Sequence, residues 1–262
     1  MGFELEFEET FEGDSLDRDR WLPYYLPHWS SRERSAARYE IGGGTLRLLI
    51  EADQPAWCPE LDGEVRVSSL QTGSFAGPVG STIGQHRFNP AAVVREEQPN
   101  VQFYTPLYGR VELRAQASDD PQAMVAFWMI GFEDAPERSA EICICEIFGR
   151  DVQRDDAVVG VGVHPFGDPS IADDFSRVSM PIDAREFHVY AADWAPDGVA
   201  LTVDGDVLKT VDQSPAYPMQ LMLGIYDLRS RETERPTDGY PKTFVVDSVR
   251  GYRRTGVGLT TR

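Results

Sequence analysis

The chain of 262 residues lacks the features on which several classes of protein depend. It has 43 acidic but only 25 basic side chains, a formal net charge of −18, and no tract of basic residues. Nucleic acids and anionic membrane surfaces are bound through clusters of Lys and Arg, so we expect neither as a partner. No apolar run is long enough to span a membrane. The composition favours a neutral or cationic partner.

Cysteines and targeting segments are also scarce. Cys58, Cys143 and Cys145 are too few for a disulfide framework, and we expect buried or free thiols. Two cysteines two residues apart, without a second pair, do not have the spacing of a zinc site. The segment from Met1 to Glu6 has neither the cationic start nor the apolar stretch of a secretion signal. As written, the chain is expected in the cytoplasm unless it has already been trimmed.

Helical periodicity is missing as well, because no window repeats apolar residues at i, i+3, i+4 and i+7 over three turns. Instead, 23 Gly and 18 Pro separate short segments in which apolar and polar residues alternate, as at 45–50, 110–115 and 244–249. Asp204-Gly205 lies between two such segments and predicts a hairpin with a type I′ turn. The predicted fold class is therefore all-β, with two antiparallel sheets in a sandwich or jelly roll.

One domain is predicted for residues 1–262, because all-β sandwiches often reach this length as a single unit. Only the tail at 255–262 is expected to fray. Residues 73–108 carry few strand signals and several Gly and Pro. Long loops in compact domains are commonly functional, so we expect this segment to border a binding cleft.

Two acids interrupt the apolar segment that runs from Glu141 to Phe148, where a buried strand tolerates isolated charges poorly. In a regular strand Glu141 and Glu146 point to opposite faces. A one-residue β-bulge would turn both to one face and place their carboxyls about 5–6 Å apart, the separation found in retaining glycosidases. Alternatively, Glu141 faces the core with a polar partner and Glu146 faces solvent. The spacing alone leaves both arrangements open.

Several motifs, in order, resemble family 16 of the glycoside hydrolases, which includes laminarinase- and lichenase-like endo-β-glucanases. The segment Glu141-Ile142-Cys143-Ile144-Cys145-Glu146 is similar to the family motif Glu-x-Asp-x-x-Glu, with Cys143 in place of the Asp. Further matches are Tyr108-Gly109-Arg110, Ala126-Phe127-Trp128, His188-Val189-Tyr190-Ala191-Ala192-Asp193-Trp194 and Val203-Asp204-Gly205. They extend from about Phe11 to Tyr252. The resemblance implies a concanavalin A-like jelly roll of two antiparallel sheets.

The resemblance also implies roles for the two acids. Glu141 matches the nucleophile, and Glu146 matches the general acid/base of a retaining double displacement. Cys143 stands where the family motif has an aspartate between the two glutamates, and its thiol offers only a weak S–H donor. Because a like charge is missing there, we expect a lower pKa for Glu146 than in the family arrangement, and a less efficient enzyme.

Four further residues are implied as contacts to substrate: Trp128, His164, Tyr226 and Arg66. Trp128 and Tyr226 would each present an aromatic face to a sugar, with core packing as the alternative. Arg66 would donate hydrogen bonds to a distal sugar or form a surface ion pair. His164 follows the carboxylates on the next strand and is the favoured one of four histidines. Trp29 and Trp57 are weaker candidates for the rim of the cleft.

A structural calcium site is implied on the convex face of the fold. Asp247 would supply its carboxylate, with carbonyl oxygens near Glu9 and Gly44, and such hard oxygen ligands suit Ca²⁺. The alternative is that Asp247 is an ordinary surface residue. No cofactor is expected to take part in catalysis.

The predicted function is a retaining endo-β-glycosidase that hydrolyses internal bonds of a neutral polysaccharide, with β-1,3- or β-1,3/1,4-glucan as the first choice. The net charge of −18 would repel sulfated or uronic polymers. The alternatives are a carbohydrate-binding protein that has lost catalysis through Cys143 and a transglycosylase that shares the covalent intermediate. We expect a monomer, and a polysaccharide substrate places it outside the cell although no export signal is visible.

Overall fold

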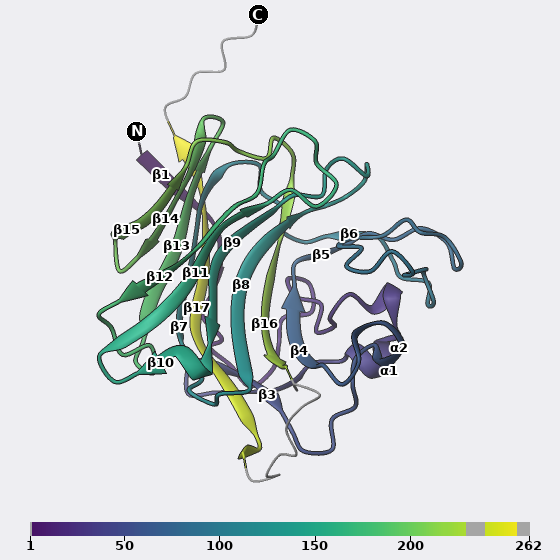
Figure 1. The fold of residues 1–262 in the computed structure, drawn as a ribbon, viewed down its shortest axis with the longest axis horizontal. Coiled ribbons are helices and arrows are strands. Elements are labelled where there is room, and N and C mark those ends of the chain that lie inside the picture. The colour runs from purple at the N-terminus through teal and green to yellow at the C-terminus, as the bar shows by residue number, and fades with distance from the viewer. Residues whose placement is uncertain (1, 229–238, 256–262) are drawn as a thin grey trace, which may run out of the picture.

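Two large antiparallel sheets make up most of the computed structural model, which describes residues 2–228 and 239–255 (Figure 1). The strands of the first sheet are β1 (Gly2–Glu9), β2 (Arg38–Gly42), β3 (Thr45–Ile50), β7 (Gly109–Gln116), β13 (His188–Ala195), β14 (Gly198–Val203), β15 (Asp206–Val211) and β17 (Lys242–Thr255). The strands of the second are β4 (Arg66–Gln71), β8 (Ala123–Gly131), β9 (Glu141–Phe148), β10 (Val152–Gln153), β11 (Asp156–His164), β12 (Asp174–Met180) and β16 (Met219–Asp227). A small third sheet pairs β5 (Gly73–Ser74) with β6 (Val101–Gln102).

The strand orders show that neighbours in space are often distant in sequence. The eight-stranded sheet has the order β15-β14-β13-β7-β17-β3-β2, with β1 also paired to β17. The seven-stranded sheet has the order β10-β11-β9-β8-β16-β4, with β12 also paired to β11. Helical structure among the described residues is limited to short segments: η1 (Pro27–Trp29), α1 (Arg32–Ser35), α2 (Pro59–Asp62) and η2 (Gly149–Asp151). The predicted all-β jelly-roll fold is confirmed.

The sequence patterns that predicted strands also explain the core. β7 alternates buried and partly exposed residues along its length, and its buried residues Val111, Leu113 and Ala115 pack between the sheets. The predicted segments at 45–50, 110–115 and 244–249 lie in β3, β7 and β17. Asp204 and Gly205 join β14 to β15 with φ angles of 51° and 88°, as a type I′ turn requires.

A second apolar cluster covers the outer face of the seven-stranded sheet. Its members come from strands β4, β8 and β16 and from the segments that contain η1, α1 and α2: Tyr25, Leu26, Trp29, Trp57, Cys58, Val67, Ala126, Trp128, Ile130, Met222 and Tyr226 are among them. β16 is consequently buried along both faces. In Figure 1, α1 and α2 lie beside β4 at one edge of this sheet. The segments that contain η1, α1 and α2 form a loop layer over this face of the sheet. A pocket can form between this loop layer and the strands.

The three cysteines are free and buried, as the sequence predicts. Of the tail expected to fray, Thr255 ends β17 opposite Gly2, and residues 256–262 lie outside the described part of the chain. No helix within residues 2–228 and 239–255 has the length and apolar character to cross a membrane.

Candidate active site

A β-bulge in β9 turns Glu141 and Glu146 to the same face of the sheet. Glu141 lies opposite Ile130 of β8, and Glu146 lies opposite Ala126. Between them, Cys143 and Cys145 face the adjacent residues Trp128 and Phe127, so Ile144 is the extra residue. The register against β11 shifts at the same place. The bulge that the sequence analysis considered is therefore present.

The bulge divides β9 between the core and a pocket. Ile142, Ile144, Cys145 and Ile147 point into the core between the sheets. Glu141, Cys143 and Glu146 line one pocket on the opposite face. The alternative arrangement, with Glu141 in the core and Glu146 on the other face, is excluded by this geometry.

The pocket has a volume of about 270 Å³ and a mixed lining. Its aromatic and acidic residues are Tyr25, Trp57, Phe88, Trp128, Tyr226, Glu141, Glu146 and Asp62, and His86 completes one side. Aromatic rings beside carboxyl groups can hold the apolar face of a ligand while hydrogen bonds fix its orientation. The arrangement suits a polyhydroxylated ligand.

Burial changes the acidity of both glutamates. It raises the pKa of Glu141 to about 8, and the neighbouring charge of Glu146 adds to this effect. Burial also raises the pKa of Glu146, although the positive charges of His164, Arg177 and Arg150 oppose it. In the free pocket, burial therefore favours the protonated form of both acids. The resemblance implies a resting state with Glu141 ionised and Glu146 protonated.

Cys143 lies between the two acids and stays uncharged. Its Sγ donates to the carbonyl oxygen of Gly160 at 3.7 Å. Burial and the charges of Glu141 and Glu146 keep the thiol pKa well above its ordinary value. Where an aspartate would add a further acidic group to the pocket, this chain places a neutral donor.

Trp128 and Tyr226 belong to a connected aromatic group. Trp128 Nε1 donates to the Tyr226 hydroxyl at 3.3 Å, and Tyr25 shares a hydrogen bond with the same hydroxyl. Gly224 leaves room for this arrangement, because a Cβ there would lie 3.2 Å from the Tyr226 ring. Both predicted residues line the pocket, and Tyr25, which no motif marked, joins them.

Two histidines lie near the carboxylates: His86 lines the pocket, whereas the predicted His164 is not among its lining residues. His164 pairs in register with Glu141, and its Nδ1 lies 2.6 Å from a carboxylate oxygen of Asp173. His86, which the sequence placed only in a probable loop, lies 5.1 Å from Trp128 between ring centroids and lines the pocket. Burial lowers the pKa of His86 to about 4, so its ring is neutral at pH 7.

The segment from Gly73 to Tyr108 borders the pocket, as predicted, through His86 and Phe88. Trp57 also lines it, with Nε1 donating to Asp62 at 2.6 Å. Trp29 does not reach the pocket, because it is fully buried behind the loop layer and its Nε1 donates to the carbonyl of Gln85. Asp62, the last residue of α2, was missed because only tertiary structure brings its carboxyl to the sheet.

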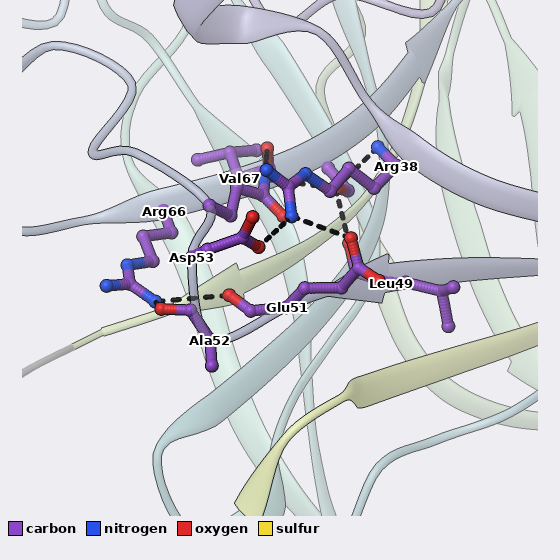
Figure 2. Close-up of polar contacts among 9 residues, drawn as sticks. Arg38, Leu49, Glu51, Ala52, Asp53, Arg66 and Val67 are labelled. Atoms are coloured by element: carbon purple, nitrogen blue, oxygen red, sulfur yellow. Dashed lines mark hydrogen bonds and ion pairs between the residues drawn. The ribbon is translucent and has the colours of Figure 1, made fainter. Parts of the chain in front are cut away.

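Arg66 is not part of the site, contrary to the sequence expectation. Its neighbour Val67 packs in the cluster on the pocket face of the sheet, and adjacent strand residues point to opposite faces. The Arg66 guanidinium instead donates to the carbonyl oxygens of Glu51 and Ala52, at 3.2 and 2.9 Å (Figure 2). It also lies over the ring of Tyr240. Arg66 therefore ties β4 to the segment after β3.

The predicted calcium ligands lie on the eight-stranded sheet or its turns. Asp247 Oδ1 forms an ion pair with Arg114 at 2.8 Å, and a Glu9 carboxylate oxygen accepts from the Phe11 amide. Gly44 turns between β2 and β3 beside the Glu12 carboxylate. Within the described residues, no three Asp, Glu, His or Cys side chains gather as a metal site would need. Bound calcium would have to rely on carbonyl oxygens, and it stays a prediction.

Comparisons with known proteins agree with this fold. The profile of glycosyl hydrolases family 16 matches residues 102–240. The structure of a GlcNAcα1-4Gal-releasing endo-β-galactosidase from Clostridium perfringens superposes with a TM-score of 0.82 and 29% identity, covering 96% of this chain and 62% of that one. This chain thus spans less than two thirds of the galactosidase. No match was found among curated proteins.

Two laminarinases share the fold at lower identity. The enzyme from Flavobacterium sp. UMI-01 superposes with a TM-score of 0.66 and 19% identity, covering 95% of this chain and 100% of that one. The catalytic domain from Thermotoga petrophila RKU-1 has a TM-score of 0.66 and 16% identity, with coverages of 97% and 99%.

Replacing Glu141 by Gln should change how stability depends on pH. The folded-state pKa of Glu141 is raised to about 8, so its stabilising contribution is complete below the unfolded pKa of 4.5 and is lost as pH rises through 8. A neutral amide has no such loss. We expect Glu141→Gln to match the wild type at pH 4 and to exceed its stability at pH 8.5 by about 2–4 kcal/mol, or roughly 5–10 °C in Tm.

Calorimetry at the two pH values measures this difference. Glu137→Gln is the matched control, because Glu137 is exposed on the connection that leads into β9. If Glu141→Gln and Glu137→Gln had the same pH dependence as the wild type, Glu141 would not hold its proton in the folded state.

Proposed function

Because the chain belongs to family 16 of the glycosyl hydrolases, we propose that it is a retaining endo-β-glycosidase that cleaves internal bonds of a neutral glycan. The observation that carries this proposal is the bulge that turns Glu141 and Glu146 into one pocket. A double displacement requires two carboxyls on one face of the site. The aromatic walls supply surfaces on which sugar rings stack.

In the proposed first step, the Glu141 carboxylate attacks the anomeric carbon while the Glu146 carboxyl gives its proton to the leaving oxygen. In the second step, Glu146 takes a proton from water, and the water oxygen displaces Glu141 with net retention. His164, Arg177 and Arg150 stabilise the ionised form of Glu146 between these steps. Attack requires Glu141 ionised and Glu146 protonated, so the burial that raises the pKa of Glu141 opposes this step and the burial that raises the pKa of Glu146 assists it.

Comparison with the Clostridium perfringens enzyme points to a β-galactosidic bond as the first candidate. That endo-β-galactosidase is 29% identical with a TM-score of 0.82, whereas the laminarinases described above are at most 19% identical. A β-1,3- or β-1,3/1,4-glucan is the second candidate, favoured by the ordered motifs that resemble endo-β-glucanases. In both cases the net charge of −18 disfavours an anionic polymer.

The proposal extends to how and where the protein works. A glycan polymer implies action outside the cell, and the displacement needs only side chains of one chain, so we propose a monomer without a catalytic cofactor. A carbohydrate-binding protein and a transglycosylase remain alternatives that the assays below separate.

Release of reducing ends tests the proposal directly. Purified protein is incubated with porcine gastric mucin, keratan sulfate, poly-N-acetyllactosamine, laminarin and lichenan, with Glu141→Gln as the inactive control. We expect cleavage of a neutral β-galactoside chain, with the β-anomer appearing first by NMR. Binding without cleavage would indicate a lectin-like protein, and longer products would indicate a transglycosylase.

Azide rescue tests the roles of the two acids. With an aryl β-glycoside of the cleaved sugar, Glu141→Ala removes the nucleophile, so azide attacks directly and yields the α-glycosyl azide. Glu146→Ala still forms the glycosyl-enzyme, and azide then yields the β-glycosyl azide. We expect these two products, identified by NMR. The opposite pairing would exchange the roles of Glu141 and Glu146.

Cys143 should set the pH range of activity. An aspartate at this position would add a negative charge between Glu141 and Glu146 and raise the pKa of both, so we expect Cys143→Asp to shift the kcat/KM profile to higher pH by about 0.5–1 unit. Cys143→Asn is the control of similar shape without the charge. Coincident profiles for Cys143→Asp and Cys143→Asn would mean that a charge at position 143 does not change the pKa values of Glu141 and Glu146.

A further inference from the structure

A second cavity, of about 640 Å³, lies next to the carboxylate pocket and shares His86 with it. Its walls come from the 73–108 segment, from the connection between β8 and β9, and from the turn after β11. They include Thr82, Ile83, Arg87, Glu133, Ser139 and Phe166. The volume falls within the range of small-molecule sites. Nothing in the proposed displacement uses this cavity.

The two cavities lie in different directions from Glu141. The carboxylate pocket crosses the sheet, because Tyr226, Trp128 and Glu146 stand on the neighbouring strands β16, β8 and β9. The second cavity lies beyond the ends of those strands, where β8 stops and β9 begins. These strands run side by side in Figure 1. A glycan bound across the strands would therefore not pass through the second cavity, and a group in that cavity would project to one side of the glycan chain.

The mouth of the second cavity is apolar. The side chains of Phe166 and Ile83 are 50% and 51% exposed. Exposed apolar surface is unfavourable in water, and a bound ligand would cover it. The rings of His86 and Phe166 meet edge to face at 4.7 Å between centroids. Such a rim suits the apolar face of a sugar ring.

Apart from the exposed Arg87, the polar groups of the second cavity are uncharged at neutral pH or paired with an opposite charge. The Glu133 carboxyl accepts from the His86 amide at 2.5 Å, and burial raises its pKa to about 8. The neutral His86 ring has a buried Nδ1 with no hydrogen-bond partner among the described residues. Asp134 is paired with Arg138, and Arg87 donates to loop carbonyls. Neutral donors and acceptors match hydroxyl or acetamido groups, and the Arg87 guanidinium can donate to the same groups.

The backbone around this cavity is strained at three places. His86, Glu133 and Phe166 have φ angles of 50°, 58° and 44°, in the left-handed region that non-glycine residues rarely occupy. Strain of this kind persists where the surrounding structure requires it, and it clusters at ligand sites. All three residues line the second cavity.

From the cavity, its position and its wall, we propose that it binds a neutral sugar residue branching from the glycan held in the carboxylate pocket. The protein would then prefer a substituted chain to a linear one. This inference rests on the proposed function for the identity of the main chain, and the cavity has room for a neutral branch such as a hexose or an N-acetylhexosamine.

A substitution that fills the cavity tests the inference. Thr82→Trp places a large ring at an exposed position on the wall, and Val79→Trp does the same on the same segment at a residue outside the wall. Substrates are compared as linear and branched pairs: linear and branched poly-N-acetyllactosamine, and linear laminari-oligosaccharides against laminarin with its single-glucose branches. We expect Thr82→Trp to lower kcat/KM about tenfold for the branched member alone, which corresponds to about 1.4 kcal/mol. Val79→Trp should leave both members unchanged.

A binding measurement separates failure of this inference from failure of the proposed function. In the Glu141→Gln background, saturation-transfer NMR follows methyl β-D-galactoside and methyl N-acetyl-β-D-glucosaminide. We expect Thr82→Trp, but not Val79→Trp, to reduce the saturation transferred from the protein to these two sugars. If no polymer is cleaved while the signal depends on position 82, the hydrolase proposal fails and the sugar site stands. Equal losses on linear and branched substrates, or a signal indifferent to Thr82→Trp, would overturn the branch site.

Discussion

The proposed chemistry depends on one extra residue in β9. If Ile144 took a regular position in the strand instead of forming the bulge, Glu146 would point into the core between the sheets, where an unpaired charge is costly. With it, two acids face the pocket and four apolar or thiol side chains still fill the core. Neighbouring strands accommodate the bulge through the register shift in β11, so the site is built into the hydrogen-bond ladder itself.

The same burial that positions the acids also makes them difficult to ionise. Glu141 lies among aromatic rings and holds its proton in the free pocket, while cationic side chains oppose the rise at Glu146. A neutral Cys143 keeps the total negative charge lower than an aspartate would. The pair therefore titrates as a unit whose proton a bound ligand can redistribute.

Local patterns predicted the strands, the Asp204-Gly205 hairpin and the role of the 73–108 segment, because alternation and turn chemistry are properties of short segments. The paired acids could be recognised because they interrupt an apolar strand. Tyr25, Asp62 and His86 carried no comparable signal, since only long-range packing brings their loops to the sheet. Arg66 was wrongly predicted to contact substrate, because neighbouring residues of a strand point to opposite faces of the sheet and Val67, not Arg66, lies on the pocket face.

The pocket draws its two kinds of residue from different parts of the chain. The acids and Trp128 lie within residues 102–240, the span that matches the family profile, whereas Tyr25, Trp57, Asp62, His86 and Phe88 precede it. The loops that carry these earlier residues rest on the sheet without belonging to its strand ladder. In an evolving lineage, such loops can acquire insertions and substitutions that alter which glycan fits, while the strands that hold the reacting groups stay as they are.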